Sequence, residues 1–186
     1  ITVLRKKINI SSVEGMNVDQ NGTAYIRLVQ FTSRSGAEFK EAISDLKEKG
    51  MKRLILDLRD NSGGLLSAAI EITECFLSKG QLIVSIKGRK KNEVRDYHSN
   101  TEENLPDIPM VVLMNEGSAS ASEIVGGALS VLGRAPIIGE QSFGKGSVQT
   151  IFPMEDESGL RLTTAMYFLP DGSTIHEEGI EPQFKV

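Results

Sequence analysis

Two nearly continuous hydrophobic runs constrain the fold of this chain more than any other feature. Residues 54–58 and 110–114 consist almost entirely of Leu, Ile, Val and Met, which is typical of strands buried on both faces of a sheet. Each run is followed by small or polar residues and then by apolar residues at helical spacing. This alternation predicts an α/β fold in which helices cover a mixed sheet.

The remaining elements follow from period-two and helical patterns. Strands are predicted at residues 2–10, 23–30, 53–58, 82–87, 110–114, 136–138, 148–152 and 160–168. Helices are predicted at 36–49, from the glycine pair 63–64 to about 78, and from about 120 to 133. The polar segment 99–107 is the predicted mobile loop. No repeat or domain boundary is evident, so residues 1–186 are expected to form a single domain.

Composition excludes several classes of protein. The net charge of −4 with interspersed signs lacks the broad basic surface of a nucleic-acid-binding protein, and no apolar run reaches the length of a membrane span. The short basic cluster at 89–91 is expected to be a solvated hairpin end. Cys75 is expected to be buried and inert. Because the chain opens at Ile1 rather than at methionine, we expect a fragment or a processed product.

The segment before the third helix contains three candidate nucleophiles, Ser118, Ser120 and Ser122. Ser120 and Glu123 have the spacing of a capping box, which explains Ser120 as a helix cap. A helix start is also where a serine is exposed and where free amides and the helix dipole stabilise developing negative charge. Ser120 is therefore a candidate for both roles, and the amide of Ala121 is a candidate oxyanion donor.

A serine nucleophile needs a base, and the base is usually histidine. Both histidines, His98 and His176, lie in polar segments, and a surface position is expected for each. A lysine can replace histidine where burial lowers the pKa of an ammonium group. Lys145, which lies between two glycines, is the candidate base, with an exposed hairpin lysine as the alternative. Gln149 would share its strand face and could orient it.

The pair Gly63 and Gly64 interrupts the chain between a buried strand and a helix. Glycines at such a turn free backbone amides to point at a ligand. The pair therefore predicts either oxyanion donors or a plain strand-to-helix turn.

A P-loop is the main rival interpretation, because residues 139–145 have its glycine and lysine spacing and residues 54–57 resemble a strand that holds magnesium. A P-loop requires Ser or Thr directly after the lysine and must open a helix. Here Gly146 follows Lys145, and residues 147–153 have the pattern of a strand. A nucleotide hydrolase is therefore disfavoured.

Four ordered motifs together closely resemble the carboxyl-terminal processing peptidases, also called tail-specific proteases. The motifs are Leu58-Arg-Asp-Asn-Ser-Gly-Gly-Leu-Leu66, Asn115-Glu-Gly-Ser-Ala-Ser-Ala-Ser-Glu-Ile124, Arg134-Ala-Pro-Ile-Ile-Gly-Glu140 and Phe143-Gly-Lys-Gly-Ser-Val-Gln149. The closing segment 162–182 resembles the end of the same catalytic core.

The resemblance implies a core of the crotonase and Clp protease type and a serine endopeptidase that needs neither metal nor cofactor. It implies that Ser120 is the nucleophile, Lys145 the general base and Gln149 the residue that positions the lysine. The oxyanion hole would be formed by the amide of Ala121 and those of the Gly63–Gly64 turn. Substrates would be proteins with flexible carboxyl-terminal tails. The compartment would be extracytoplasmic: periplasm, cell envelope or plastid lumen.

The chain departs from the family pattern because the PDZ domain that commonly captures the substrate tail is not in this sequence. The basic run 3–8 resembles the segment that follows such a domain, so an excised core or a naturally reduced form is expected. A non-catalytic peptide-binding module of the same fold is the alternative function. The oligomeric state is left open.

Overall fold

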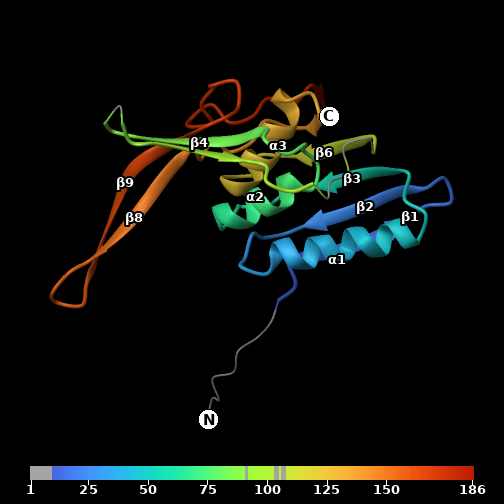
Figure 1. Cartoon of the computed structure of the whole chain (residues 1–186), viewed down its shortest axis with the longest axis horizontal. Helices are drawn as coiled ribbons and strands as arrows, with labels where there is room; N and C mark the ends of the chain where they lie inside the picture. Colours follow the sequence, from blue (N-terminus) through green and yellow to red (C-terminus); the bar gives the residue numbers. More distant parts are fainter. Residues whose placement is uncertain (1–9, 91, 103–104, 106–107) are drawn as a thin grey trace, which may run out of the picture.

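The computed structural model describes residues 10–90, 92–102, 105 and 108–186 (Figure 1). Its centre is a six-stranded sheet with the order β1-β2-β3-β6-β7-β10, parallel except for the antiparallel β1–β2 pair. The strands are β1 (Val13–Val18), β2 (Thr23–Leu28), β3 (Arg53–Asp57), β6 (Met110–Met114), β7 (Ile137–Gly139) and β10 (Phe184–Lys185). Helices α1 (Ser35–Glu48), α2 (Leu66–Glu74) and α3 (Ala121–Val131) lie in the connections between successive parallel strands, and α2 packs against both other helices.

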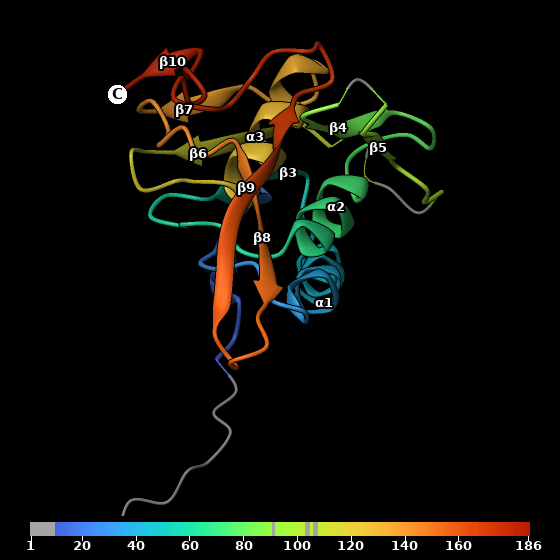
Figure 2. The ribbon, with the colours of Figure 1, turned by 90° about the vertical axis from the view of Figure 1, so that its left-hand side faces the viewer.

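A second, antiparallel sheet has the order β5-β4-β9-β8. Its strands are β4 (Leu82–Gly88), β5 (Val94–His98), β8 (Ser147–Pro153) and β9 (Gly159–Phe168). The sheet contacts α2 and α3 through β4. Strands β8 and β9 continue beyond the body of the molecule as a two-stranded projection, here called the β8–β9 arm (Figures 1 and 2).

The core lies between the helices and one face of the six-stranded sheet. The predicted stripe of α1 is buried, and so are the inward residues of α3. The stripe residues are Phe39, Ala42, Ile43 and Leu46 in α1, and Ile124, Val125, Ala128 and Leu129 in α3. Burial on both faces of the central strands was predicted, but one face of β3 and β6 carries residues that are only half-buried, Ile55, Val111 and Leu113. The helices cover only the other face.

The predicted α/β class is confirmed, and the three helices form with ends close to those expected. Three strands were not predicted: β1 and β5 are largely exposed and lack apolar alternation, and β10 has only two residues. The predicted strand 2–10 lies outside the described residues except for Ile10, which is in no strand. The described residues of 99–107 contain no helix or strand. In the part of the chain that the structure covers, no helix combines the length and the apolar character needed to cross a bilayer.

The loops that follow four neighbouring parallel strands meet at one edge of the sheet. Each loop is joined to the next by backbone hydrogen bonds. These bonds are Phe31 N–H to Gly63 O (3.1 Å), Ala119 N–H to Asn61 O (3.0 Å) and Phe143 N–H to Ser118 O (3.0 Å). Ligands of open α/β sheets bind beyond the carboxyl ends of the strands, so these loops mark the place to look for a site.

Asp57 anchors the start of the loop after β3. Its fully buried carboxylate accepts from the Tyr25 hydroxyl (2.7 Å), from Arg59 Nε (2.9 Å) and Nη2 (2.6 Å), and from the Arg59 amide (2.9 Å). Burial alone would raise the pKa of Asp57, but the hydrogen bonds from Arg59 and Tyr25 outweigh it and hold the pKa below its usual range. The ionised carboxylate therefore stabilises the fold at neutral pH.

Tyr25→Phe should lower the free energy of unfolding at pH 7 by about 1.5 kcal/mol, the lower end for a hydrogen bond to a charged group. The stability that the depressed pKa of Asp57 contributes is fully present above its unfolded value of about 4 and is lost as the pH falls through the lower folded value, so the difference from wild type should shrink over that range. Urea unfolding across the pH range measures both effects. Tyr167→Phe is the control, since no hydrogen bond of its hydroxyl is described; an equal loss there would contradict the prediction.

Candidate active site

Asn61 joins the loop after β3 to the end of β2 and to the start of α3. Its buried side chain donates from Nδ2 to Leu28 O (2.7 Å) and accepts the Gly63 N–H at Oδ1 (2.9 Å). Its backbone carbonyl accepts from Ala119 N–H (3.0 Å) and from Ser122 Oγ (2.8 Å). One residue thereby fixes the glycine pair against the start of α3.

The glycine pair is packed so closely that neither position has room for a side chain. Both residues have positive φ, 98° at Gly63 and 147° at Gly64. A Cβ at Gly63 would lie 2.6 Å from Ala119 O and 2.9 Å from Ser120 Cβ, and one at Gly64 would overlap Phe31 O. Glycine is therefore required here for close approach, and the predicted turn lies directly against Ser120.

Ser120 occupies a strained turn at the start of α3. Its φ of 55° and ψ of −110° lie outside the regions that non-glycine residues favour. Such a conformation costs about 1–3 kcal/mol and persists only where its surroundings impose it. Here the Glu123 carboxylate accepts the Ser120 N–H (2.7 Å), as the predicted capping box requires. Strained backbone conformations of this kind cluster at functional sites.

The other two candidate serines have structural roles. Ser118 is fully buried and its hydroxyl donates to Leu58 O (2.8 Å). Ser122 is also fully buried and donates to Asn61 O (2.8 Å). Ser120 is only partly buried. Of the three serines, Ser120 is thus the one that is not fully buried.

Glu123 connects the Ser120 turn to the loop that carries Lys145. The buried carboxylate accepts from the Ser120 amide, from the amides of Gly144 (2.7 Å) and Lys145 (2.9 Å), and from Ser142 Oγ (2.6 Å). Four donors compensate the burial of one negative charge. The sequence pattern had indicated only the capping contact, because the other partners lie about twenty residues further along the chain.

Residues 174–180 support the Lys145 loop from its other side. Glu177 N–H donates to Gly144 O (2.9 Å), and Ile180 N–H donates to Ser142 Oγ (2.7 Å). A Cβ at Gly146 would lie 2.5 Å from the backbone nitrogen of His176. The loop is held between Glu123 and this segment.

The backbone amides of Ser120 and Lys145 are linked through Glu123, but the side chains of the predicted catalytic group are not linked in this way. Lys145 and Gln149 are exposed, and within the described residues no hydrogen bond joins the side chains of Ser120, Lys145 and Gln149. Phe143, two residues before Lys145, is itself 68% exposed. The burial expected for Lys145 is therefore not seen in this structure. Catalytic hydrogen bonds commonly tighten only when substrate binds.

Two amides beside Ser120 are available as donors. Gly63 N–H is used by Asn61, whereas Gly64 N–H and Ala121 N–H have no acceptor among the residues that the structure describes. Gly64 is exposed, and Ala121 is the first residue of α3. The geometry therefore favours Gly64 over Gly63 as the partner of Ala121.

The described residues argue against a P-loop and against a reactive cysteine. Residues 147–153 form strand β8 rather than a helix, and Asp57 is occupied by Arg59 and Tyr25, so the P-loop interpretation is wrong. Burial raises the pKa of the Cys75 thiol to about 11, as expected of an inert cysteine. Within the described ranges, no group of three or more His, Cys, Asp or Glu side chains could hold a metal ion.

Sequence comparison assigns the chain to a family. Residues 22–186 match the model of peptidase family S41. The chain belongs to peptidase family S41. It is 46% identical over its whole length to a carboxy-terminal-processing protease of Bartonella bacilliformis and 38% identical over its whole length to the carboxy-terminal processing protease CtpA of Bacillus subtilis. It spans 43% and 39% of these two relatives, which is less than half of each.

Solved S41 structures have the same fold. The photosystem II D1 C-terminal processing protease superposes with a TM-score of 0.85 at 32% identity, over 98% of this chain and 50% of that one. A putative S41 protease from Bacteroides fragilis superposes with a TM-score of 0.80 at 18% identity, over 97% of this chain and 52% of that one, which supports the fold alone. The expected crotonase and Clp protease type of core is confirmed.

Glu123→Gln should loosen the connection between Ser120 and the Lys145 loop. The new amide group is a donor that faces other donors, so the free energy of unfolding should fall by about 3 kcal/mol. Amide hydrogen exchange at residues 143–146 should accelerate. Urea unfolding and exchange mass spectrometry measure the two effects. Glu116→Gln, an exposed neighbour without a described contact, should change stability by less than about 0.5 kcal/mol. Unchanged exchange at 143–146 in Glu123→Gln would contradict the role of Glu123.

Gly63→Ala should destabilise the protein by about 3 kcal/mol, because a left-handed alanine is strained and its methyl group meets backbone atoms that cannot rotate away. Gly80→Ala is the matched control: Gly80 also has positive φ (88°) but open space around its Cβ position, so only the strain of about 1 kcal/mol applies. Thermal and urea unfolding compare the two. An equal loss of unfolding free energy in the two variants would show that close packing against Ser120 does not contribute to the destabilisation.

Proposed function

We propose that residues 1–186 form a single catalytic domain of a serine endopeptidase that cleaves proteins near their carboxyl termini with a Ser120–Lys145 dyad. The observation that carries this proposal is the arrangement around Ser120. A strained serine at a helix start lies beside two amides that have no acceptor in the described part of the chain, and it is connected through Glu123 to the loop of Lys145. Membership of peptidase family S41 supports the same reaction.

In the first step the neutral amine of Lys145 accepts the proton of Ser120 Oγ, and the oxygen attacks the carbonyl carbon of the scissile peptide bond. The carbonyl oxygen becomes an oxyanion that accepts hydrogen bonds from the amides of Gly64 and Ala121. The positive end of the α3 dipole adds to this stabilisation.

In the second step the tetrahedral intermediate collapses, the C–N bond breaks, and Lys145 gives its proton to the leaving amine. The acyl group remains on Ser120 as an ester. A water molecule, deprotonated by Lys145, then attacks the ester carbonyl, and Ser120 regains its proton as the acid product leaves. Gln149 orients the lysine amine during these transfers.

The exposure of Lys145 is consistent with this mechanism. A polypeptide that binds over the 142–146 loop would exclude water from the lysine, and loss of water favours the neutral amine that a base requires. Substrate binding would then complete the dyad. Without bound substrate, Ser120 would stay unactivated.

The substrate class follows from the names of the relatives, which are carboxy-terminal processing proteases. We propose that the substrates of this protein are proteins with flexible carboxyl-terminal tails, because only an extended segment can pass an active site built at a sheet edge. We place the activity outside the cytoplasm, in periplasm, cell envelope or plastid lumen, by resemblance to the family.

A fluorophosphonate probe tests the nucleophile directly. Wild type should gain the mass of the probe on Ser120, and Ser120→Ala should not. Peptide cleavage should fall by at least about 10⁴ in Ser120→Ala and by about 10² to 10⁴ in Lys145→Ala. Ser62→Ala and Lys49→Ala are exposed controls that should keep full activity. Peptide binding without labelling or turnover would contradict the proposal and indicate a non-catalytic binding module.

A further inference from the structure

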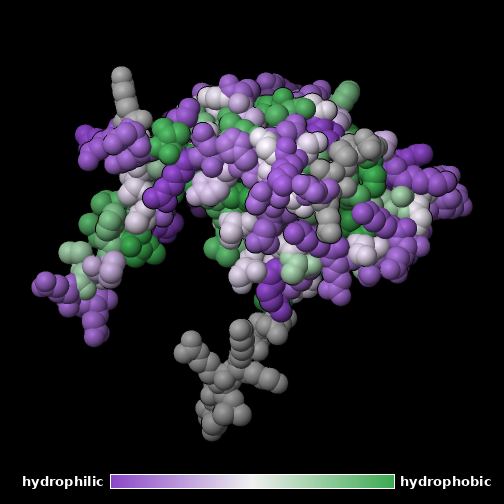
Figure 3. Space-filling view, in the orientation of Figure 1, coloured by the Kyte–Doolittle hydropathy of each residue, from purple (hydrophilic) through white to green (hydrophobic). Residues whose placement is uncertain are grey.

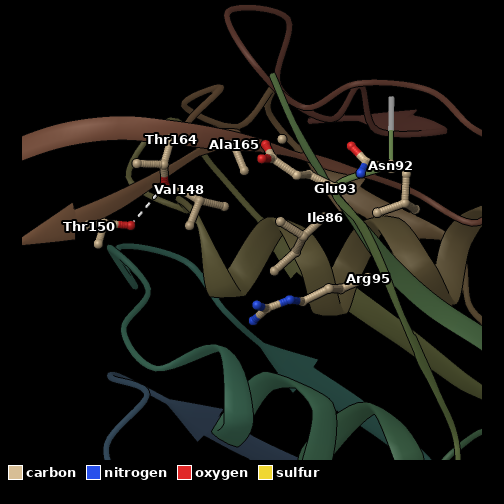
Figure 4. A pocket seen from close by; sticks show the side chains of 10 residues that line it. Ile86, Asn92, Glu93, Arg95, Val148, Thr150, Thr164 and Ala165 are labelled. Atoms are coloured by element: carbon tan, nitrogen blue, oxygen red, sulfur yellow. Dashed lines mark hydrogen bonds between the residues drawn. The ribbon is translucent and has the colours of Figure 1, made fainter. Parts of the chain in front are cut away.

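A cavity of about 460 Å³ lies at the root of the β8–β9 arm, on one face of the second sheet. Figure 4 shows the side chains around it, and it is here called the arm-root cavity. Its wall includes Ile86, Arg95, Val148, Thr150, Thr164 and Ala165. The two threonine hydroxyls are bonded to each other (2.8 Å). The wall mixes apolar and polar side chains, and it also contains Asn92 and the carboxylate of Glu93. Apolar walls with a few placed polar groups are the usual composition of a ligand pocket.

Arg95 is the cation of this cavity. It lies on β5 opposite Ile86 of β4, and in Figure 4 its guanidinium extends past Ile86, away from the carboxylate of Glu93. Arg95 makes no hydrogen bond or ion pair within the described part of the chain, while the Glu93 carboxylate accepts from the Lys90 amide (3.3 Å). A planar guanidinium with free donors matches a carboxylate in charge and shape.

The face of the arm that continues from the cavity is apolar. Val148 and Thr150 are paired with Ala165 and Leu162, and Phe152 is paired with Leu160. Directly opposite residues share a face, so these pairs form one stripe with the cavity wall. Phe152, Leu160 and Leu162 are 42–47% exposed along this stripe, and hydrophobic residues are visible on the arm in Figure 3. Strand β8 is an edge strand without charged residues, a form that pairs readily with another extended chain.

The arm-root cavity lies within reach of the proposed active site. Val148 follows Lys145 by three residues, which is about 10 Å in an extended chain, and β5 lies three strands from β8, about 14 Å across the sheet. The tips of β2 and β3 point toward the side where the arm projects (Figure 1), and the arm crosses in front of the sheet when seen from that side (Figure 2). An extended segment of about five residues spans this separation.

We propose that Arg95 binds a carboxylate of the polypeptide substrate, either the chain terminus or an acidic side chain about five residues from the scissile bond. The apolar face of the arm contacts the side chains next to that carboxylate. The inference rests on the proposed peptidase function and adds a residue that determines specificity. Arg95 acts on binding rather than on the chemical step, so its effect belongs in KM and not in kcat.

Three fluorogenic peptides of one sequence test the proposal: one with a free carboxyl terminus, one amidated, and one amidated with a glutamate five residues after the cleaved bond. Arg95→Gln should raise KM about tenfold for the free acid, as expected for loss of a charged hydrogen bond. Arg95→Gln should leave kcat unchanged, and it should not change KM for the amidated peptide that lacks the glutamate. Arg95→Lys should recover part of the loss. Arg161→Gln, on the opposite face of the arm, is the control and should behave as wild type.

The third peptide identifies the source of the carboxylate. A loss with the free acid alone assigns Arg95 to the chain terminus, and a loss with the glutamate peptide extends it to acidic side chains. Equal KM values for wild type and Arg95→Gln on every peptide would overturn the inference while leaving the peptidase intact. Fluorescence anisotropy of the same peptides on Ser120→Ala, with and without Arg95→Gln, measures binding without turnover. If wild type neither cleaves nor reacts with the probe, the peptidase proposal fails, and the anisotropy result still decides the role of Arg95.

Discussion

The organisation of the site depends on one buried carboxylate. Glu123 is inaccessible to water and accepts four hydrogen bonds, which come from the Ser120 turn and from the loop of Lys145. A buried charge in this position is tolerable only while its donors stay in place. The same contacts that compensate the charge therefore hold the two loops in register. The relative position of the proposed nucleophile and the proposed base is therefore held mainly by backbone amides and not by their own side chains.

Around this carboxylate, four loops at the sheet edge are locked to one another. Asn61 binds the loop of the glycine pair to β2 and to α3, and Gly63 lies against the Ser120 backbone with no room for a methyl group. Such packing explains how a serine can be kept at a φ of 55°. The strain is balanced by hydrogen bonds elsewhere in the loops. Among the described residues, the amides of Gly64 and Ala121 have no acceptor.

Local patterns were enough to predict much of this protein, and non-local contacts account for the rest. The apolar runs at 54–58 and 110–114 and the stripe of α1 fixed the class of fold, and the capping box located Ser120. The further partners of Glu123 could not be predicted, because no sequence spacing relates it to Gly144. Exposed strands such as β1 and β5 lack the apolar alternation that reveals buried ones. The exposure of Lys145 depends on tertiary packing, which the glycines beside it do not reveal.

The support of the Lys145 loop by residues 174–180 has a consequence for the order in which the protein matures. During synthesis the Ser120 turn, its glycine pair and Glu123 leave the ribosome well before Ile180 does. Gly144 and Ser142 gain their outer contacts only when that last segment has emerged and folded back. The nascent chain thus carries Ser120 for about sixty residues of further synthesis before the Lys145 loop is fully supported, and a half-made copy would lack the finished arrangement of the proposed site.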